Sequence, residues 1–149
     1  MSYQPKYTPD ECRQVQLDPR MLEVYRDKDL KKSEKEFHLN NLWGRLQDKH
    51  QIAKPVLLHL HNRRFLPEGG SGLATVEQDH KAEAHIAFKD RPLFRALITM
   101  AHEYRHCYQM LAMNWYPEDI LELEGDATAF SYDFVTDYCK EVFLNEQPA

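Results

Sequence analysis

Residues 95–111, RALITMAHEYRHCYQML, are the stretch on which the expected fold depends. Apolar side chains recur in it every three or four residues, which is typical of an amphipathic helix. With His102 as the reference on a helical wheel, the polar face carries Arg95, Thr99, Glu103, His106 and Gln109. The opposite face carries Leu97, Met100, Tyr104, Cys107, Tyr108 and Leu111. The two histidines are therefore predicted to lie outside the apolar core.

His102, Glu103 and His106 form an H-E-x-x-H motif on the polar face of this helix. Histidines four residues apart project from the same side of a helix, so both imidazoles can reach one metal ion. Glu103 lies about 100° around the helix from His102, where it can reach a metal-bound water without being a ligand. Zinc lowers the pKa of such a water, and a carboxylate can then accept its proton. The motif thus predicts Zn²⁺ on His102 and His106, with Glu103 as general base.

A catalytic zinc needs a third protein ligand, and the acidic segment 118–126 is the nearest source of one. Glu122 and Asp126 are four residues apart and share a face of the next predicted helix. One carboxylate on the metal and a second one orienting a ligand histidine would suit such a site. Glu118 and Glu124 are the competitors. Glu124 lies about 160° from Glu122 on the wheel, so both cannot face the metal.

The remaining segments predict an α+β fold. Helices are expected to begin near residues 8 and 19, and a third helix covers 33–49. Alternating apolar residues predict a strand at 55–61, and two further short strands are expected at 73–77 and 84–88. Two long helices follow, at 90–112 and 117–143.

This order of elements predicts helices packed on one side of a small three-stranded sheet. With 149 residues the chain is expected to form one domain, 1–149. Its helical N-terminal part would be 1–53 and its metal-binding core 54–149.

H-E-x-x-H at 102–106 followed by E-x-E-x-D-A at 122–127 resembles the gluzincin metallopeptidases. The small ImmA/IrrE-like and heat-shock-type members are the most similar. This resemblance implies a zincin-like fold, with Glu122 as the third ligand and Asp126 as the group that orients a ligand histidine. It covers about 45 residues, from Ala84 to Phe130. Gly125 departs from the pattern, because Ala is usual there.

The resemblance also implies where a peptide or protein substrate binds. In that family the strand before the motif helix is a sheet edge, and the substrate adds to it as a further strand. Strand 84–88 is the counterpart here. His85 on this strand could polarise a substrate carbonyl or could simply be an exposed strand residue.

Composition argues against several other classes of protein. The net charge of −5 does not favour binding to nucleic acid. No apolar stretch approaches the length of a membrane span, and no signal peptide is evident. Cys12, Cys107 and Cys139 are widely separated, which indicates neither a disulfide framework nor a cysteine zinc site. A cytoplasmic protein is expected.

Two functions follow from these patterns. The first is a zinc-dependent peptidase, most simply an endopeptidase, that hydrolyses a peptide bond by Glu-assisted attack of water. The alternative is a non-catalytic zinc-binding regulatory or structural module. A purely structural site would have no need of Glu103, which favours the enzyme. His59 and His61 alternate on one strand face and could bind a second metal, although no third ligand is evident from the sequence.

Overall fold

A computed structural model describes residues 30–61, 72–77, 82–88 and 91–144 of the chain. These residues form an α+β fold, as predicted. The elements, in chain order, are α3 Lys32–Lys49, β1 Val56–His61, β2 Gly72–Val76, β3 Ala82–Ala87, α4 Leu93–Leu111 and α5 Ile120–Phe143. The predicted helices near residues 8 and 19, and the predicted start of the motif helix at residue 90, lie outside the described residues.

The three strands form one mixed sheet in the order β1-β3-β2. β3 is the central strand: it runs parallel to β1, with His59 opposite His85, and antiparallel to β2, with Gly72 opposite Ile86. Because β3 is paired on both sides, it has no open edge to which a peptide could add. The expectation that strand 84–88 is an open sheet edge is therefore wrong, and among the described strands β2 is the edge strand next to it.

Alternation along the strands gives the sheet two different faces. Ala82, Ala84 and Ile86 of β3 are buried in the core, together with Val56 of β1. Residues between them, such as His59 and Glu83, point to the other face. The small alanines on the inner face let a helix approach the sheet closely.

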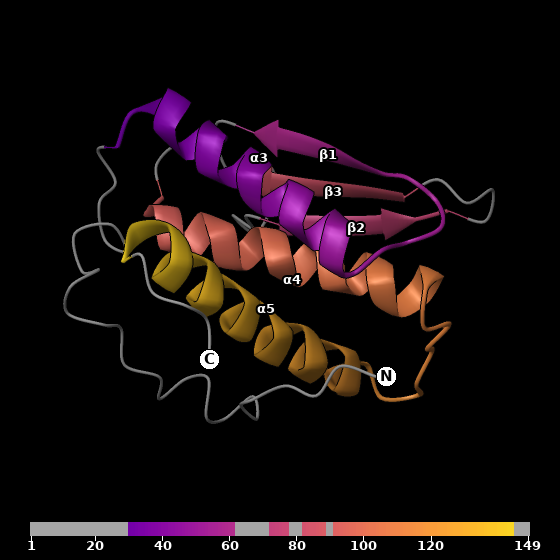
Figure 1. The fold of residues 1–149 in the computed structure, drawn as a ribbon. Helices are drawn as coiled ribbons and strands as arrows, with labels where there is room; N and C mark the ends of the chain where they lie inside the picture. The colour runs from indigo at the N-terminus through magenta and orange to yellow at the C-terminus, as the bar shows by residue number, and fades with distance from the viewer. Residues whose placement is uncertain (1–29, 62–71, 78–81, 89–90, 145–149) are drawn as a thin grey trace.

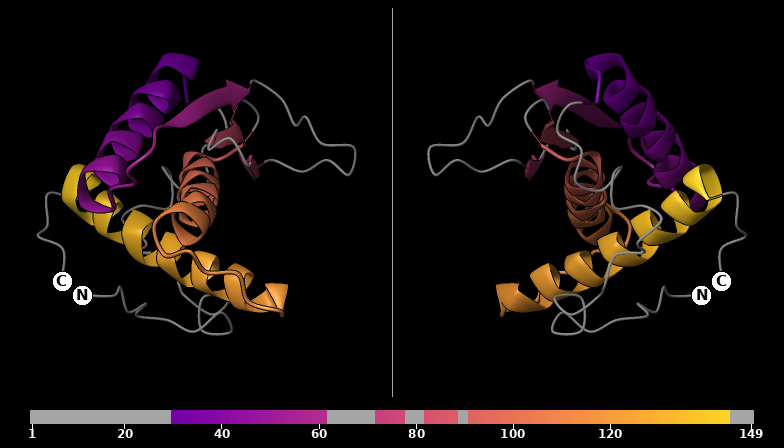
Figure 2. Two further views of the ribbon diagram at one scale, coloured as in Figure 1. Left: turned by 90° about the vertical axis from the view of Figure 1, so that its right-hand side faces the viewer. Right: turned by 90° about the vertical axis from the view of Figure 1, so that its left-hand side faces the viewer.

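Helix α4 is the central element of the molecule. It packs against β2 and β3 on one side and against α3 and α5 on the others. All three described helices lie on the same side of the sheet, and α4 lies between the sheet and α5 (Figure 1, Figure 2). Its apolar residues Leu97, Met100 and Tyr104 are buried, as the helical wheel predicts.

Helix α5 begins at Ile120, three residues later than expected, because the side chain of Asp119 caps its first turn. Asp119 is its N-cap, and the carboxylate accepts a hydrogen bond of 2.9 Å from the backbone N–H of Leu121. Leu121 and Ile120 are exposed. Among the described residues, the helices are too short or too polar to cross a membrane.

Gly72, at the start of β2, marks a close approach between the sheet and α4. A Cβ atom at this position would lie 2.5 Å from Cγ2 of Thr99 and 2.8 Å from Oε2 of Glu103. The methyl group of Thr99 is held by a β-branched side chain on a helix and cannot rotate away easily. The absence of a side chain at residue 72 therefore lets β2 lie directly against the turn of α4 that carries Glu103.

Two glycine-to-alanine substitutions should have opposite effects on stability. Gly72→Ala should destabilise the fold by about 1–3 kcal/mol, because the new methyl group forces β2 away from α4. Gly44→Ala should stabilise it by about 0.5–1 kcal/mol, because Gly44 lies inside α3 and nothing is within 4 Å of an added Cβ. Urea denaturation of both variants checks this, and equal effects would contradict the close packing of β2 on α4.

Candidate metal centre

Side chains from α4 and α5 converge on one point. Nε2 of His102 lies 3.0 Å from Oε2 of Glu124, and Nε2 of His106 lies 3.0 Å from Oε1 of the same carboxylate. The two Nε2 atoms are 3.1 Å apart. Each imidazole nitrogen thus faces a different oxygen of one carboxylate. One ligand atom from each of the three residues lies within 4.8 Å of the others, and the group could hold a metal ion.

These separations fit a small tetrahedral cation. With zinc-to-ligand bonds of about 2.0–2.1 Å, two ligands of a tetrahedral site are roughly 3.3 Å apart. The two imidazole nitrogens, at 3.1 Å, are only slightly closer than this, and each lies 3.0 Å from an oxygen of Glu124. Glu124 is 50% exposed, so the centre is reachable from solvent on the α5 side.

The structure places Glu124, and not Glu122, beside the two histidines. Glu122 is exposed in the first turn of α5. From the sequence, Glu124 was the competitor of Glu122 for the third ligand position, and the geometry favours Glu124. The rotation of α5 about its own axis, which the sequence alone does not reveal, decides between the two carboxylates.

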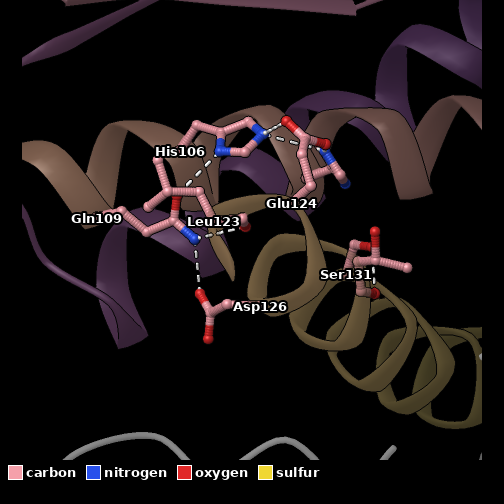
Figure 3. Close-up of polar contacts among 8 residues, drawn as sticks. His106, Gln109, Leu123, Glu124, Asp126 and Ser131 are labelled. Carbon is pink, nitrogen blue, oxygen red and sulfur yellow. Dashed lines mark hydrogen bonds and ion pairs between the residues drawn. The ribbon is translucent and has the colours of Figure 1, made fainter. Parts of the chain in front are cut away.

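A hydrogen-bond chain orients His106. Nδ1 of His106 lies 2.9 Å from Oε1 of Gln109. The amide nitrogen of Gln109 donates to the carbonyl of Leu123 at 3.0 Å and to Oδ2 of Asp126 at 2.8 Å (Figure 3). These two acceptors fix the amide so that its oxygen faces His106. His106 must then carry its proton on Nδ1, which leaves the lone pair of Nε2 for a metal.

Asp126 therefore acts on the histidine through Gln109, whereas a direct contact was expected. Its carboxylate also accepts two hydrogen bonds from Arg105, at 2.7 Å from Nε and 3.2 Å from Nη2. Arg105 is buried, and its guanidinium lies over the ring of Phe130. The sequence analysis gave no role to Gln109 or Arg105. The signal for Gln109 was present, because it lies three residues after His106 on the same helix face.

Glu103 is partly buried next to these groups. Burial raises the pKa of its carboxyl group to about 7; the nearby His106 lowers it and the charge of Glu124 raises it. Burial also lowers the pKa of His102, which favours the neutral imidazole that a metal requires. Glu103 makes its close approach to β2 at Gly72.

His85 and Cys107 do not take part in this centre. His85 is on the face of the sheet away from the helices, where it contacts Glu83 and His61. It cannot polarise a carbonyl at the H-E-x-x-H centre. Cys107 is buried on the apolar face of α4, as expected, and burial raises the pKa of its thiol to about 12. This thiol is thus protonated at neutral pH and is not a ligand.

Glu103→Gln should stabilise the metal-free protein in a pH-dependent way. The carboxyl group of Glu103, with a pKa of about 7 in the folded state, binds more protons in the folded than in the unfolded state between pH 4.5 and 7. Ionised Glu103 therefore lowers the free energy of unfolding by an increasing amount as the pH rises through this window. The gain from the substitution should be less than about 1 kcal/mol at pH 5 and about 3 kcal/mol at pH 8. Urea denaturation with a chelator present measures it, and the exposed Glu122→Gln is the control. An equal gain at both pH values would contradict the burial of Glu103.

Comparisons of the chain with protein-family models, with curated proteins and with solved structures find no match. The similarity to gluzincin peptidases accordingly rests on residues 102–106 and 122–127 of the sequence.

Proposed function

We propose that this protein is a zinc-dependent peptidase in which His102, His106 and Glu124 bind the metal and Glu103 is the general base. The observation that carries the proposal is the convergence of two imidazole nitrogens and one carboxylate within 3.0–3.1 Å of one another. Two histidines and one glutamate form a known type of catalytic zinc site, in which a fourth position stays open. Zinc bound there supplies Lewis acidity, which makes a water molecule more acidic and polarises a carbonyl group.

The protein side chains supply the proton transfers. Glu103 accepts a proton on its carboxylate as water oxygen forms a bond to the substrate carbonyl carbon. The same carboxyl group then returns the proton to the amide nitrogen as the carbon–nitrogen bond breaks. His106 is kept in the required tautomer by Gln109. Gln109 and Asp126 are therefore positioning residues, because they act through the histidine.

The substrate is proposed to lie along β2. This strand pairs with β3 on one side, and its residue Gly72 lies against Glu103. An extended peptide added to the other side of β2 would gain backbone hydrogen bonds and would run past the general base. The proposed peptide-binding strand is therefore β2, Gly72–Val76, which lies at the edge of the sheet beside the strand that was expected to bind the peptide, 84–88.

A non-catalytic zinc-binding module remains the alternative function. It would need the three ligands but not a buried carboxylate at residue 103. Burial of Glu103 destabilises its charged form, and a structural site gains nothing from that cost. This observation favours the peptidase, and the two experiments below separate the metal site from the reaction.

The two candidate carboxylates should differ in their effect on zinc affinity. Glu124→Ala removes a direct ligand and should weaken zinc binding by about 100-fold or more, whereas the exposed Glu122→Ala should change it less than about 3-fold. Gln109→Ala should weaken binding by about 10–100-fold, because it releases the imidazole of His106. Competition with a chromophoric chelator measures all three. A stronger effect of Glu122→Ala would return the ligand role to that residue.

Glu103→Gln should separate catalysis from metal binding. The variant should fold, keep its zinc and lose about two to four orders of magnitude in kcat, because only the proton acceptor is removed. Cleavage of a broad library of unstructured peptides is the assay, and Glu122→Gln is the matched control that should keep full activity. Turnover that survives Glu103→Gln would exclude this mechanism. Peptide binding without cleavage by the zinc-loaded wild type would favour the non-catalytic module.

A further inference from the structure

The face of the sheet opposite the helices carries a second group of metal-ligating side chains. His59 and His61 project from β1, and Glu83 and His85 project from β3. We call these four residues the sheet-face cluster. Register brings them together, because His59 lies opposite His85 and His61 lies two residues further along the same strand. From the sequence, only the two histidines of β1 were candidates for a second metal site. Glu83 is 24 residues from His59 in the sequence, and only the pairing of β1 with β3 brings the two together.

The functional groups of the cluster converge on one carboxylate. Oε1 of Glu83 lies 3.3 Å from Nε2 of His59, and Oε2 lies 3.4 Å from Nε2 of His85. The two imidazole rings are stacked, with centroids 4.4 Å apart and an interplanar angle of 8°. One ligand atom from each of the three residues lies within 4.8 Å of the others, which a small cation could bridge after modest side-chain rotation.

The contacts of Glu83 are long for hydrogen bonds between a carboxylate and an imidazole. Charge-assisted bonds of this kind are usually about 2.7–2.9 Å. The side chains of His59, Glu83 and His85 are 41%, 23% and 21% exposed, so they are reachable from solvent. The arrangement is that of three ligands that point toward a common centre and do not yet form strong bonds to one another.

His61 contributes to this arrangement through His85. Its Nε2 lies 2.9 Å from Nδ1 of His85. When His85 donates from Nδ1 to His61, the lone pair of its Nε2 is directed toward Glu83 and is available to a metal.

We propose that His59, Glu83 and His85 form a second metal site, which binds a divalent transition-metal cation of the zinc type. His61 is its positioning residue. Two imidazoles favour zinc, nickel or copper over magnesium or calcium, which prefer oxygen ligands. The site lies on the outer face of the sheet, and the H-E-x-x-H centre lies on the helix side. The inference does not depend on the proposed peptidase function.

Metal bound at this position would join β1 to β3. β1 is the strand at the other edge of the sheet, and β3 is its only neighbour among the described strands. A cation that binds the folded but not the unfolded chain raises the melting temperature. The second site is therefore a stabilising element of the sheet edge, with solvent-exposed coordination positions.

Zinc titration of the full chain tests the proposal. After metal removal by a chelator, isothermal titration calorimetry with Zn²⁺ alone, supported by elemental analysis after dialysis, should give two zinc ions per wild-type chain. His59→Ala/His85→Ala should bind one, and His102→Ala/His106→Ala should also bind one, at the other site. Leu57→Ala, an exposed apolar residue beside the cluster on β1, should keep both. A large excess of Mg²⁺ should displace neither ion.

Further variants separate a built site from casual binding to exposed histidines. Glu83→Gln, which keeps the shape of the side chain, should abolish the second binding event. His61→Ala should weaken it by about 10–100-fold, and His61→Gln should restore most of the affinity by replacing the acceptor. Zinc should still raise the melting temperature of His102→Ala/His106→Ala. The proposal would be overturned if a second zinc ion still bound to His59→Ala/His85→Ala or to Glu83→Gln. It would also be overturned if the wild-type chain bound one zinc ion and His102→Ala/His106→Ala bound none.

Discussion

The ion pair between Arg105 and Asp126 is the interaction on which the candidate metal centre depends. It is bidentate, with bonds of 2.7 and 3.2 Å, and the arginine is only 2% exposed. Burying two charges costs free energy, which only good geometry and further hydrogen bonds offset. Both conditions hold here, since Asp126 also accepts a bond from Gln109. The pair joins α4 to α5 at one register and one rotation, and that rotation brings Glu124 to the two histidines.

The same pair links the packing of the helices to the chemistry of the site. Asp126 fixes Gln109, and Gln109 sets the tautomer of His106. Loss of the ion pair would therefore disturb the candidate centre in two ways, through the position of Glu124 and through the protonation of His106. Figure 3 shows the second of these paths, from Asp126 through Gln109 to His106.

The sheet separates two chemically different surfaces. Its inner face is built from small and apolar residues, and at Gly72 it lies against Glu103 with no room for a side chain. Its outer face carries three histidines and one glutamate in mutual contact. The period of two residues along each strand makes this division automatic, because neighbouring residues must point to opposite faces. One short sheet can in this way support the candidate metal centre on one side and the proposed second metal site on the other.

The sequence by itself determined the elements and the local geometry within them. Spacing along one helix determines that His102 and His106 share a face and that Cys107 is buried, and alternation determines the strands at 55–61 and 84–88 to within two residues. Contacts between elements were decided only by the tertiary structure. Glu124 and Asp126 lie two residues apart and contact α4 at different points, because where two helices cross, long side chains can reach the partner from either flank of the contact. A helical wheel ranks residues on one helix and carries no information about how its neighbour is rotated. For the same reason, the contact of Glu83 and His85 with the histidines of β1 in the sheet-face cluster could not be predicted from the sequence, and neither could the central place of β3. Both depend on pairing between distant segments.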